Sequence, residues 1–199
     1  MVVNHKGRRM LNNLRRLISS IGIDVYLHSQ DREILQKIIL PYFSRRGEFQ
    51  RVLFIGSDWY TRGYRRFFKN REYWTLEIDP EKRKYGSARH VVDSFANVRA
   101  HFDTDSLDLI ICNGVFGFGL NSRADVDSAF QGSYECLRDG GILVHGWNDF
   151  PKARSFPPEE SQGLKLFRPF IFPPLNTARY RTNSYEHIYD FYIKPPATG

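Results

Sequence analysis

The segment RVLFIGS, residues 51–57, decides the fold class, because it is a short apolar, β-branched run that ends in glycine. Such a run is typical of a strand buried in a parallel sheet. Four further segments read as strands: YWTLEID (73–79), HVVDS (90–94), LDLIICNG (107–114) and GILVHGW (141–147). Between them lie segments that favour helices, such as 61–70 and the segment that starts at Pro80. This alternation predicts βαβ units, a parallel sheet and a three-layer α/β fold.

The chain after residue 120 closes the sheet. Residues 122–141 predict a helix that Gly140 and Gly141 end. Six prolines fall within residues 151–174 and exclude a long regular helix there. Two closing strands are predicted, ARYRT (178–182) and EHIYDFYIK (186–194), and the second alternates in period two as an antiparallel strand would. The expected sheet is seven-stranded and mostly parallel, with an antiparallel closing strand.

The N-terminal part predicts two helices ahead of the sheet. Apolar residues recur at helical spacing over 11–21, and Gly22 ends that pattern. A second helix is expected over 31–42, where Asp31 could cap the start and Pro41 marks the exit. We therefore expect a basic helical extension over residues 1–45 and an α/β domain over residues 46–199, with the two helices packing on the domain or covering a ligand.

Composition limits the class of protein. The 199 residues are 41% hydrophobic and 15% aromatic, which suits one folded domain and excludes a disordered chain. No apolar run reaches the ~18 residues of a membrane span, and arginines interrupt the basic start where a signal peptide needs an apolar core. Two cysteines without metal-ligand spacing predict neither a disulfide framework nor a metal site. A cytoplasmic protein is expected.

Charge is uneven along the chain. Residues 1–75 hold 15 Lys/Arg and 6 Asp/Glu, a net of +9, whereas residues 76–199 hold 14 and 16, a net of −2. A basic half of this kind attracts phosphates, nucleic acid or an anionic membrane surface. It also serves simply as a solvated face. No motif for binding nucleic acid accompanies the charge, so the charge alone names no partner.

Polar residues stand where four of the expected strands end. They are Gly56-Ser57-Asp58, Glu77, Asp93-Ser94 and Asn113-Gly114. In open α/β sheets ligands bind beyond the carboxyl ends of the strands, and Glu77 follows Gly56 at close to the spacing at which an acid reaches a ribose diol. Each of these groups could instead form a turn or cap a helix. Together they predict one ligand site.

From about Arg51 to Trp147 the chain resembles the class I S-adenosylmethionine-dependent methyltransferases. The matching stretches are VLFIGSDWY (52–60), TLEIDPEK (75–82), VVDS (91–94), LDLIICNGVF (107–116) and ECLRDGGILV (135–144). The resemblance implies S-adenosylmethionine as the cofactor. It further implies a Rossmann-like fold in which Gly56, Ser57 and Asp58 form the first loop, Glu77 binds the ribose hydroxyls and Asp93 accepts from the adenine amino group. Ile78, Ser94, Asn113 and Gly114 are the other cofactor-binding residues that it implies.

The first loop departs from the family pattern. Phe54 stands where the family has an acid, and Asp58 and Tyr60 replace later glycines, so the loop is bulkier. Asp58 could instead contact the methionine ammonium. The departure leaves open a non-catalytic binding module with an anionic partner. An NAD(P)-dependent oxidoreductase is a further alternative, although the chain lacks G-x-G-x-x-G and a Tyr-x-x-x-Lys pair.

The acceptor follows by elimination. Asn113-Gly114-Val115-Phe116 does not match the Asn/Asp-Pro-Pro-aromatic sequence of enzymes that methylate amino groups of bases, and neither cysteine follows a proline. O-methylation of a small molecule or a carbohydrate remains. His145 could be the base, or it could be a core histidine; Asp149 could orient the substrate or cap a segment. Five phenylalanines could wall a sugar-stacking pocket or belong to the core: Phe150, Phe156, Phe167, Phe170 and Phe172.

Overall fold

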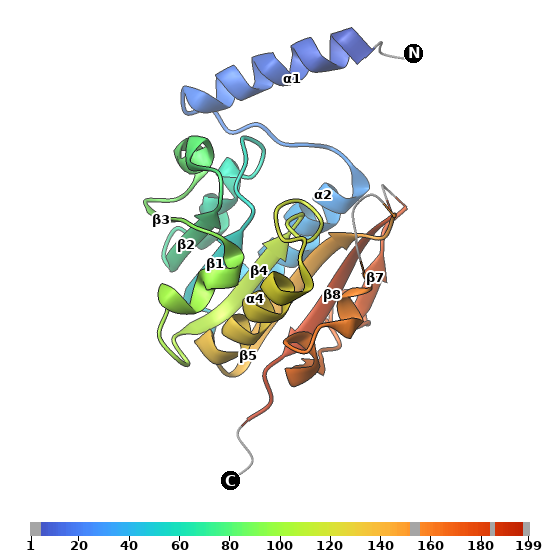
Figure 1. Ribbon diagram of the computed structural model, residues 1–199. Coiled ribbons are helices and arrows are strands. Elements are labelled where there is room, and N and C mark those ends of the chain that lie inside the picture. The colour runs from blue at the N-terminus through green and yellow to red at the C-terminus, as the bar shows by residue number, and fades with distance from the viewer. Residues whose placement is uncertain (1–4, 152–155, 184–185, 197–199) are drawn as a thin grey trace.

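The computed structural model describes residues 5–151, 156–183 and 186–196 and shows an α/β sheet with helices on both faces (Figure 1). The helices are α1 (His5–Ser20), α2 (Gln30–Ile34), the π-helical η1 (Leu35–Ile39), α3 (Leu40–Ser44) and α4 (Arg123–Cys136). The strands are β1 (Arg51–Ile55), β2 (Glu72–Glu77), β3 (Arg89–Val92), β4 (Leu107–Asn113), β5 (Leu137–Asn148), β6 (Arg168–Pro169), β7 (Arg179–Arg181) and β8 (His187–Ile193). The short 3-10 helices are η2 (Arg62–Phe68), η3 (Pro80–Tyr85), η4 (Phe95–Ala100), η5 (Pro158–Glu160) and η6 (Leu164–Leu166).

The sheet confirms the predicted fold class. Its strand order is β3-β2-β1-β4-β5-β8-β6, and β7 also pairs with β8. The first five strands are parallel, whereas β8 runs antiparallel to β5. All seven predicted strands are present, and β6 is a two-residue addition. The connections after β1, β2 and β3 are 3-10 helices, so the predicted segments 61–70 and from Pro80 onward are tighter than α-helices.

Alternate side chains of the central strands pack into two separate cores, one on each face of the sheet. Leu53 and Ile55 of β1 face the core beneath α4, while Val52 and Phe54 face the opposite core. Because both faces are covered, the strands are apolar at nearly every position, as expected for a parallel sheet. Phe54, which occupies the place of an acid in the resemblance, is 1% exposed and belongs to the core.

The predicted end of the helix over 122–141 is wrong by several residues. Helix α4 ends at Cys136, and Leu137 already has the extended backbone of β5, pairing with Leu107. Gly140 has a φ of +72° and lies inside β5, where the register against β4 shifts. The two glycines therefore form an irregularity in a strand rather than a helix cap.

The two N-terminal helical segments differ in packing. Segment α2–η1–α3 is part of the core opposite α4, and its most buried side chains are Leu35, Ile39, Leu40 and Phe43, all 0% exposed. In contrast, α1 lies apart from the sheet in Figure 1 and leaves large apolar side chains exposed, among them Met10, Leu14 and Leu17. The core therefore includes residues of the predicted extension.

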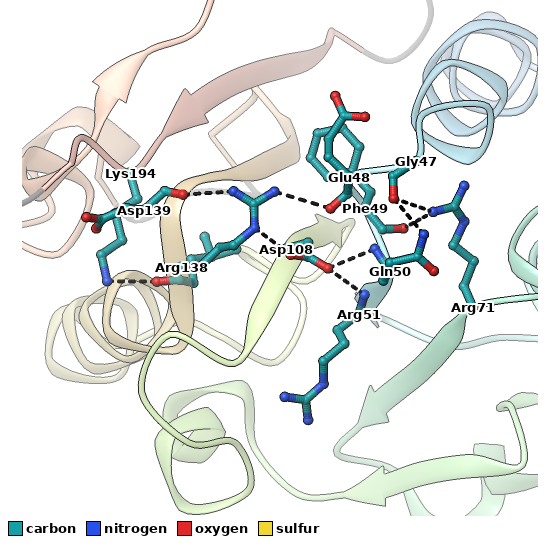
Figure 2. Close-up of polar contacts among 11 residues, drawn as sticks. Gly47, Glu48, Phe49, Gln50, Arg51, Arg71, Asp108, Arg138, Asp139 and Lys194 are labelled. Carbon is teal, nitrogen blue, oxygen red and sulfur yellow. Dashed lines mark hydrogen bonds and ion pairs between the residues drawn. The ribbon is translucent and has the colours of Figure 1, made fainter.

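At the amino edge of the sheet, several segments are connected by hydrogen bonds to one carboxylate (Figure 2). Asp108, at the start of β4, accepts hydrogen bonds from the backbone N–H groups of Gln50 (2.8 Å) and Arg51 (2.7 Å) and from Nε of Arg138 (2.6 Å). Arg71 adds a hydrogen bond from Nη1 to the carbonyl of Phe49 at 2.6 Å. These contacts fix the entry of the chain into β1.

Both cysteines are buried in the core. Cys112 lies in β4 and Cys136 at the end of α4, and burial raises the pKa of each thiol, that of Cys136 to about 11. Within the part of the chain that the structure describes, no helix combines the length and the apolar character that crossing a bilayer requires.

Candidate functional site

A cavity of about 230 Å³ opens at the carboxyl ends of β1, β2 and β4. Eight of the predicted ligand-binding residues line it: Gly56, Ser57, Asp58, Glu77, Ile78, Ser94, Asn113 and Gly114. These residues come from four strand ends that are far apart in the sequence. The parallel sheet brings them together, as expected for the crevice of an open α/β fold.

Gly56 allows the first loop to pass close to β4. Its φ is +94°, and a Cβ atom built there would lie 2.8 Å from the carbonyl oxygen of Asn113 and 2.8 Å from Val115 Cγ2. Any larger residue would meet both a strained backbone and a steric clash. Next to it, Ser57 is buried, and its Oγ has no hydrogen-bond partner among the described residues. The floor of the cavity is thus backbone with one unused hydroxyl.

Three charged side chains form the polar side of the cavity. Lys82 Nζ lies 3.3 Å from Asp58 Oδ2 and 3.9 Å from Glu77 Oε1. Burial, reinforced by the charges of Asp58 and Asp79, raises the pKa of Glu77. Burial alone would lower the pKa of Lys82, but the charges of Asp58 and Glu77 outweigh it and raise that pKa. The ammonium therefore stays charged between the two carboxyl groups.

Asp93 is not brought into the cavity. Its carboxylate accepts hydrogen bonds from the backbone N–H of Ser94 (2.6 Å), from Asn97 Nδ2 (2.8 Å) and from His101 Nε2 (2.7 Å). The hydrogen bond from His101 and then that from Asn97 lower the pKa of Asp93. At this strand end Ser94 and Phe95 line the cavity.

A second cavity of about 410 Å³ adjoins the first, because both are lined by Tyr60, Gly114 and Phe118. Its other walls come from the segment around α2 and from β5 and β8: Leu27, His28, Ser29, Asp31, Arg32, Asn148 and His187. The guanidinium of Arg32 lies over the ring of Tyr60, 4.7 Å from its centroid. The N-terminal segment therefore contributes directly to the site.

His187 connects the two cavities. Its Nδ1 lies 2.5 Å from Asn148 Oδ1, and its Nε2 lies 3.1 Å from Asn113 Oδ1. Burial lowers the pKa of His187 to about 4, with the nearby charge of Arg32 acting in the same direction, so the imidazole is neutral at pH 7. A neutral imidazole carries one N–H donor, so it donates a hydrogen bond to one of these two amide oxygens.

The two predicted catalytic residues line neither cavity. His145 is 0% exposed and packs against Phe130 (centroids 4.9 Å apart), Phe116 and Trp147. Burial, with the charge of Arg179, lowers its pKa to about 3, and neither ring nitrogen has a hydrogen-bond partner among the described residues. This placement favours the alternative reading of a core histidine. The carboxylate of Asp149 forms an ion pair with Arg181.

The proline-rich segment supplies core rather than pocket walls. Phe167 and Phe172 are buried, and Phe156 and Phe170 pack against the two cores. None of the five predicted phenylalanines lines either of the two cavities. Within the described ranges, no cluster of three or more His, Cys, Asp or Glu side chains is arranged to hold a metal ion.

The sequence analysis did not identify Lys82, Arg32, Tyr60 or His187 as residues of the site. Lys82 lies in the run PEKRK and reads there as one charge among several. Arg32 and Tyr60 belong to segments predicted as an extension and as a bulky loop. The spacing of Lys82, five residues after Glu77, carries a usable signal, because one turn after a strand end returns a side chain to the same edge.

Strand order and crevice together define a Rossmann-like α/β protein with a cavity at the carboxyl edge of its sheet. No family model matches the sequence, and no curated protein matches it. Solved structures do match the fold, and the three that follow are named as methyltransferases.

A TehB-like S-adenosylmethionine-dependent methyltransferase from Corynebacterium glutamicum is similar over 96% of this chain and 100% of that chain, with a TM-score of 0.60 and 15% identity. The N-methyltransferase NodS from Bradyrhizobium japonicum matches over 85% of this chain and 99% of that one, with a TM-score of 0.59 and 14% identity. NodS in complex with S-adenosyl-L-homocysteine matches with a TM-score of 0.57, at 14% identity, over 91% of this chain and 98% of that one. The chain therefore has the class I methyltransferase fold.

Proposed function

We propose that the protein is an S-adenosylmethionine-dependent methyltransferase that methylates a hydroxyl group of a small molecule or a carbohydrate. The observation that carries the proposal is the first cavity, in which Gly56 and Glu77 meet at the carboxyl ends of adjacent parallel strands. When bound, S-adenosylmethionine supplies an electrophilic methyl group on a sulfonium ion. The protein contributes binding and alignment, from which much of the rate of a methyl transfer can come.

The residues of the cavity fit this cofactor. Glu77 can accept hydrogen bonds from the ribose hydroxyls, and Ile78, 52% exposed, offers an apolar surface to the adenine. Ser57 Oγ is a buried group without a partner, which a ligand can satisfy. The methionine end is a zwitterion, and the cavity holds a matching pair: Asp58 for the ammonium and Lys82 for the carboxylate.

The acceptor belongs in the second cavity, which adjoins the first at Gly114. His145→Leu tests whether His145 is the base: loss of turnover would support that role. Because the imidazole of His145 is buried among aromatic rings, we expect the variant to keep its activity. Asp149→Asn is the parallel test of the second proposed catalytic residue.

Calorimetric titration with S-adenosylmethionine tests the proposal. The intact protein is expected to bind in the micromolar range, and Glu77→Gln is expected to weaken binding at least about tenfold, because a charge-assisted hydrogen bond contributes about 1.5–3 kcal/mol. Glu72→Gln is the matched control, since Glu72 begins the same strand at the opposite edge. A parallel titration with NADH tests the oxidoreductase.

Absence of S-adenosylmethionine binding would refute the cofactor assignment. Binding of neither cofactor would favour the second candidate, a non-catalytic module with an anionic partner. The exposed apolar side of α1 and its basic sequence favour such a module specifically. Its signature would be an affinity for nucleic acid that falls steeply with added salt.

A further inference from the structure

The second cavity contains an ion pair with an unused hydrogen-bonding position on each partner. Arg32 Nε lies 3.3 Å from Asp31 Oδ2, and the two side chains are 11% and 8% exposed. The remaining atoms, Asp31 Oδ1 and Arg32 Nη1, are buried and have no partner among the described residues. A buried donor and a buried acceptor without partners are costly to keep, which points to a ligand that satisfies them.

The pair is held rigidly. The carbonyl of Asp31 accepts a hydrogen bond from the Tyr189 hydroxyl at 2.9 Å, and the Arg32 guanidinium stacks on Tyr60. The following turn of helix is fully buried at Leu35. Because the backbone, the ring and the helix fix both side chains, the pair keeps a defined position beside the second cavity.

The charge of the pair selects a neutral ligand. A carboxylate or phosphate would bind Arg32 but would meet the free oxygen of Asp31, and an ammonium would meet the guanidinium in the same way. A hydroxyl group both accepts and donates, so one hydroxyl or two neighbouring hydroxyls satisfy Arg32 Nη1 and Asp31 Oδ1 together. The rings of Tyr60 and Phe118 add an apolar wall suited to C–H groups.

We infer that the second cavity binds a neutral, polyhydroxylated acceptor whose hydroxyls are held by Asp31 and Arg32. The role of this ligand as a methyl acceptor rests on the proposed function, whereas the binding site itself does not. Gly114 separates the pair from the first cavity: a Cβ built on it would lie 3.7 Å from Arg32 Nη2. A hydroxyl held by the pair therefore lies beside the proposed cofactor site.

Saturation-transfer NMR on the full chain tests the inference with three panels of small probes. The neutral panel is methyl α-D-glucopyranoside, methyl α-D-mannopyranoside and myo-inositol; the anionic panels are D-glucuronate and D-glucose 6-phosphate. We expect binding in the neutral panel and weaker binding, by at least about tenfold, of both anions, as expected for an uncompensated like charge. Preferred binding of the anions, or binding of no panel, would overturn the inference.

The double variant Asp31→Asn/Arg32→Gln provides the site-specific test, because it removes both charges together and leaves neither charge unpaired. This double variant is expected to lose binding of the neutral panel. The matched control is Asp24→Asn/Arg62→Gln, which removes a neighbouring ion pair of 2.7 Å that does not line the cavity. Unchanged binding in the first variant, or equal loss in both, contradicts the inference. Calorimetry with S-adenosylmethionine on the same samples tests the proposed function separately.

Discussion

The two edges of one sheet are built in opposite ways. At the amino edge, Asp108 accepts three hydrogen bonds, and the chain entry into β1 is held by Arg71 and Arg138 (Figure 2). At the carboxyl edge, four buried polar atoms have no partner among the described residues: Ser57 Oγ, Asp31 Oδ1, Arg32 Nη1 and Asn113 Nδ2. The carboxylate at the first edge is satisfied without a ligand, whereas these four atoms at the second edge are not.

This difference separates stability from binding. A satisfied, half-buried carboxylate contributes to the folded state, whereas unsatisfied groups lower stability until a ligand meets them. Four of the ten unsatisfied buried side-chain atoms among the described residues lie at the edge where an open α/β sheet binds ligands. Substitutions at the amino edge should therefore change unfolding, and substitutions at the carboxyl edge should change affinity.

Among the polar residues of the two edges, the largest effect on stability is expected from Asp108→Ala. It leaves two backbone N–H groups and the Arg138 guanidinium without their acceptor, which should cost about 2–4 kcal/mol of unfolding free energy. Urea unfolding measures this, with the exposed Asp103→Ala as the control that changes stability little. Cofactor affinity of the folded variant should stay within twofold; a tenfold loss would break the separation of the two edges.

His145 sharpens the comparison, because it is unsatisfied but lies in the core instead of a cavity. Its pKa in the folded protein is about 3, below that of the unfolded chain. The folded state requires a neutral His145, so its full stability is present above pH 6.5, the ordinary pKa of histidine, and is lost as pH falls toward 3. His145→Leu should reduce the loss of stability between pH 7 and pH 5 by about 2 kcal/mol. Thermal or urea unfolding across that range gives the result, and an unchanged pH profile would contradict it.

Glu77→Gln should lower the affinity for S-adenosylmethionine without lowering stability, which is the opposite of the result expected for Asp108→Ala. Because the pKa of Glu77 is raised in the folded state, its ionised form is disfavoured, and the protonated form stabilises the fold at low pH. That contribution is lost as pH rises through the folded pKa. At pH 7 the glutamine variant should be as stable as the natural chain or more stable by less than about 1 kcal/mol, even though it binds S-adenosylmethionine more weakly. A clear loss of stability would show that Glu77 belongs to the structural edge.

The smallest effect is expected in α1. Leu14 is 53% exposed, so Leu14→Ser should change the free energy of unfolding by less than about 0.5 kcal/mol. Leu40→Ala, in the buried segment α3, is the contrasting variant and should cost about 2–5 kcal/mol. Equal losses at the two positions would mean that α1 packs on the body in solution.

The sequence predicts the sheet well because β-branched apolar runs and their terminal glycines are local signals. Gly56 and Glu77 were found in the same way, since strand ends meet at one edge. His145 shows the limit: it ends an apolar run, but only the packing of Phe116 and Phe130 decides that its ring faces the core. Arg32 was missed because burial beside Tyr60 depends on a contact between segments, which a charge pattern does not reveal.

The two buried cysteines have a practical consequence for spectroscopy. Cys112 and Cys136 are shielded, and their raised pKa values leave almost no thiolate at neutral pH, so maleimides should not label the natural chain. A single cysteine introduced on the surface would then carry all of the dye. With Ser20→Cys at the end of α1, fluorescence would report the environment of that helix with and without ligands, and both native cysteines would stay in place.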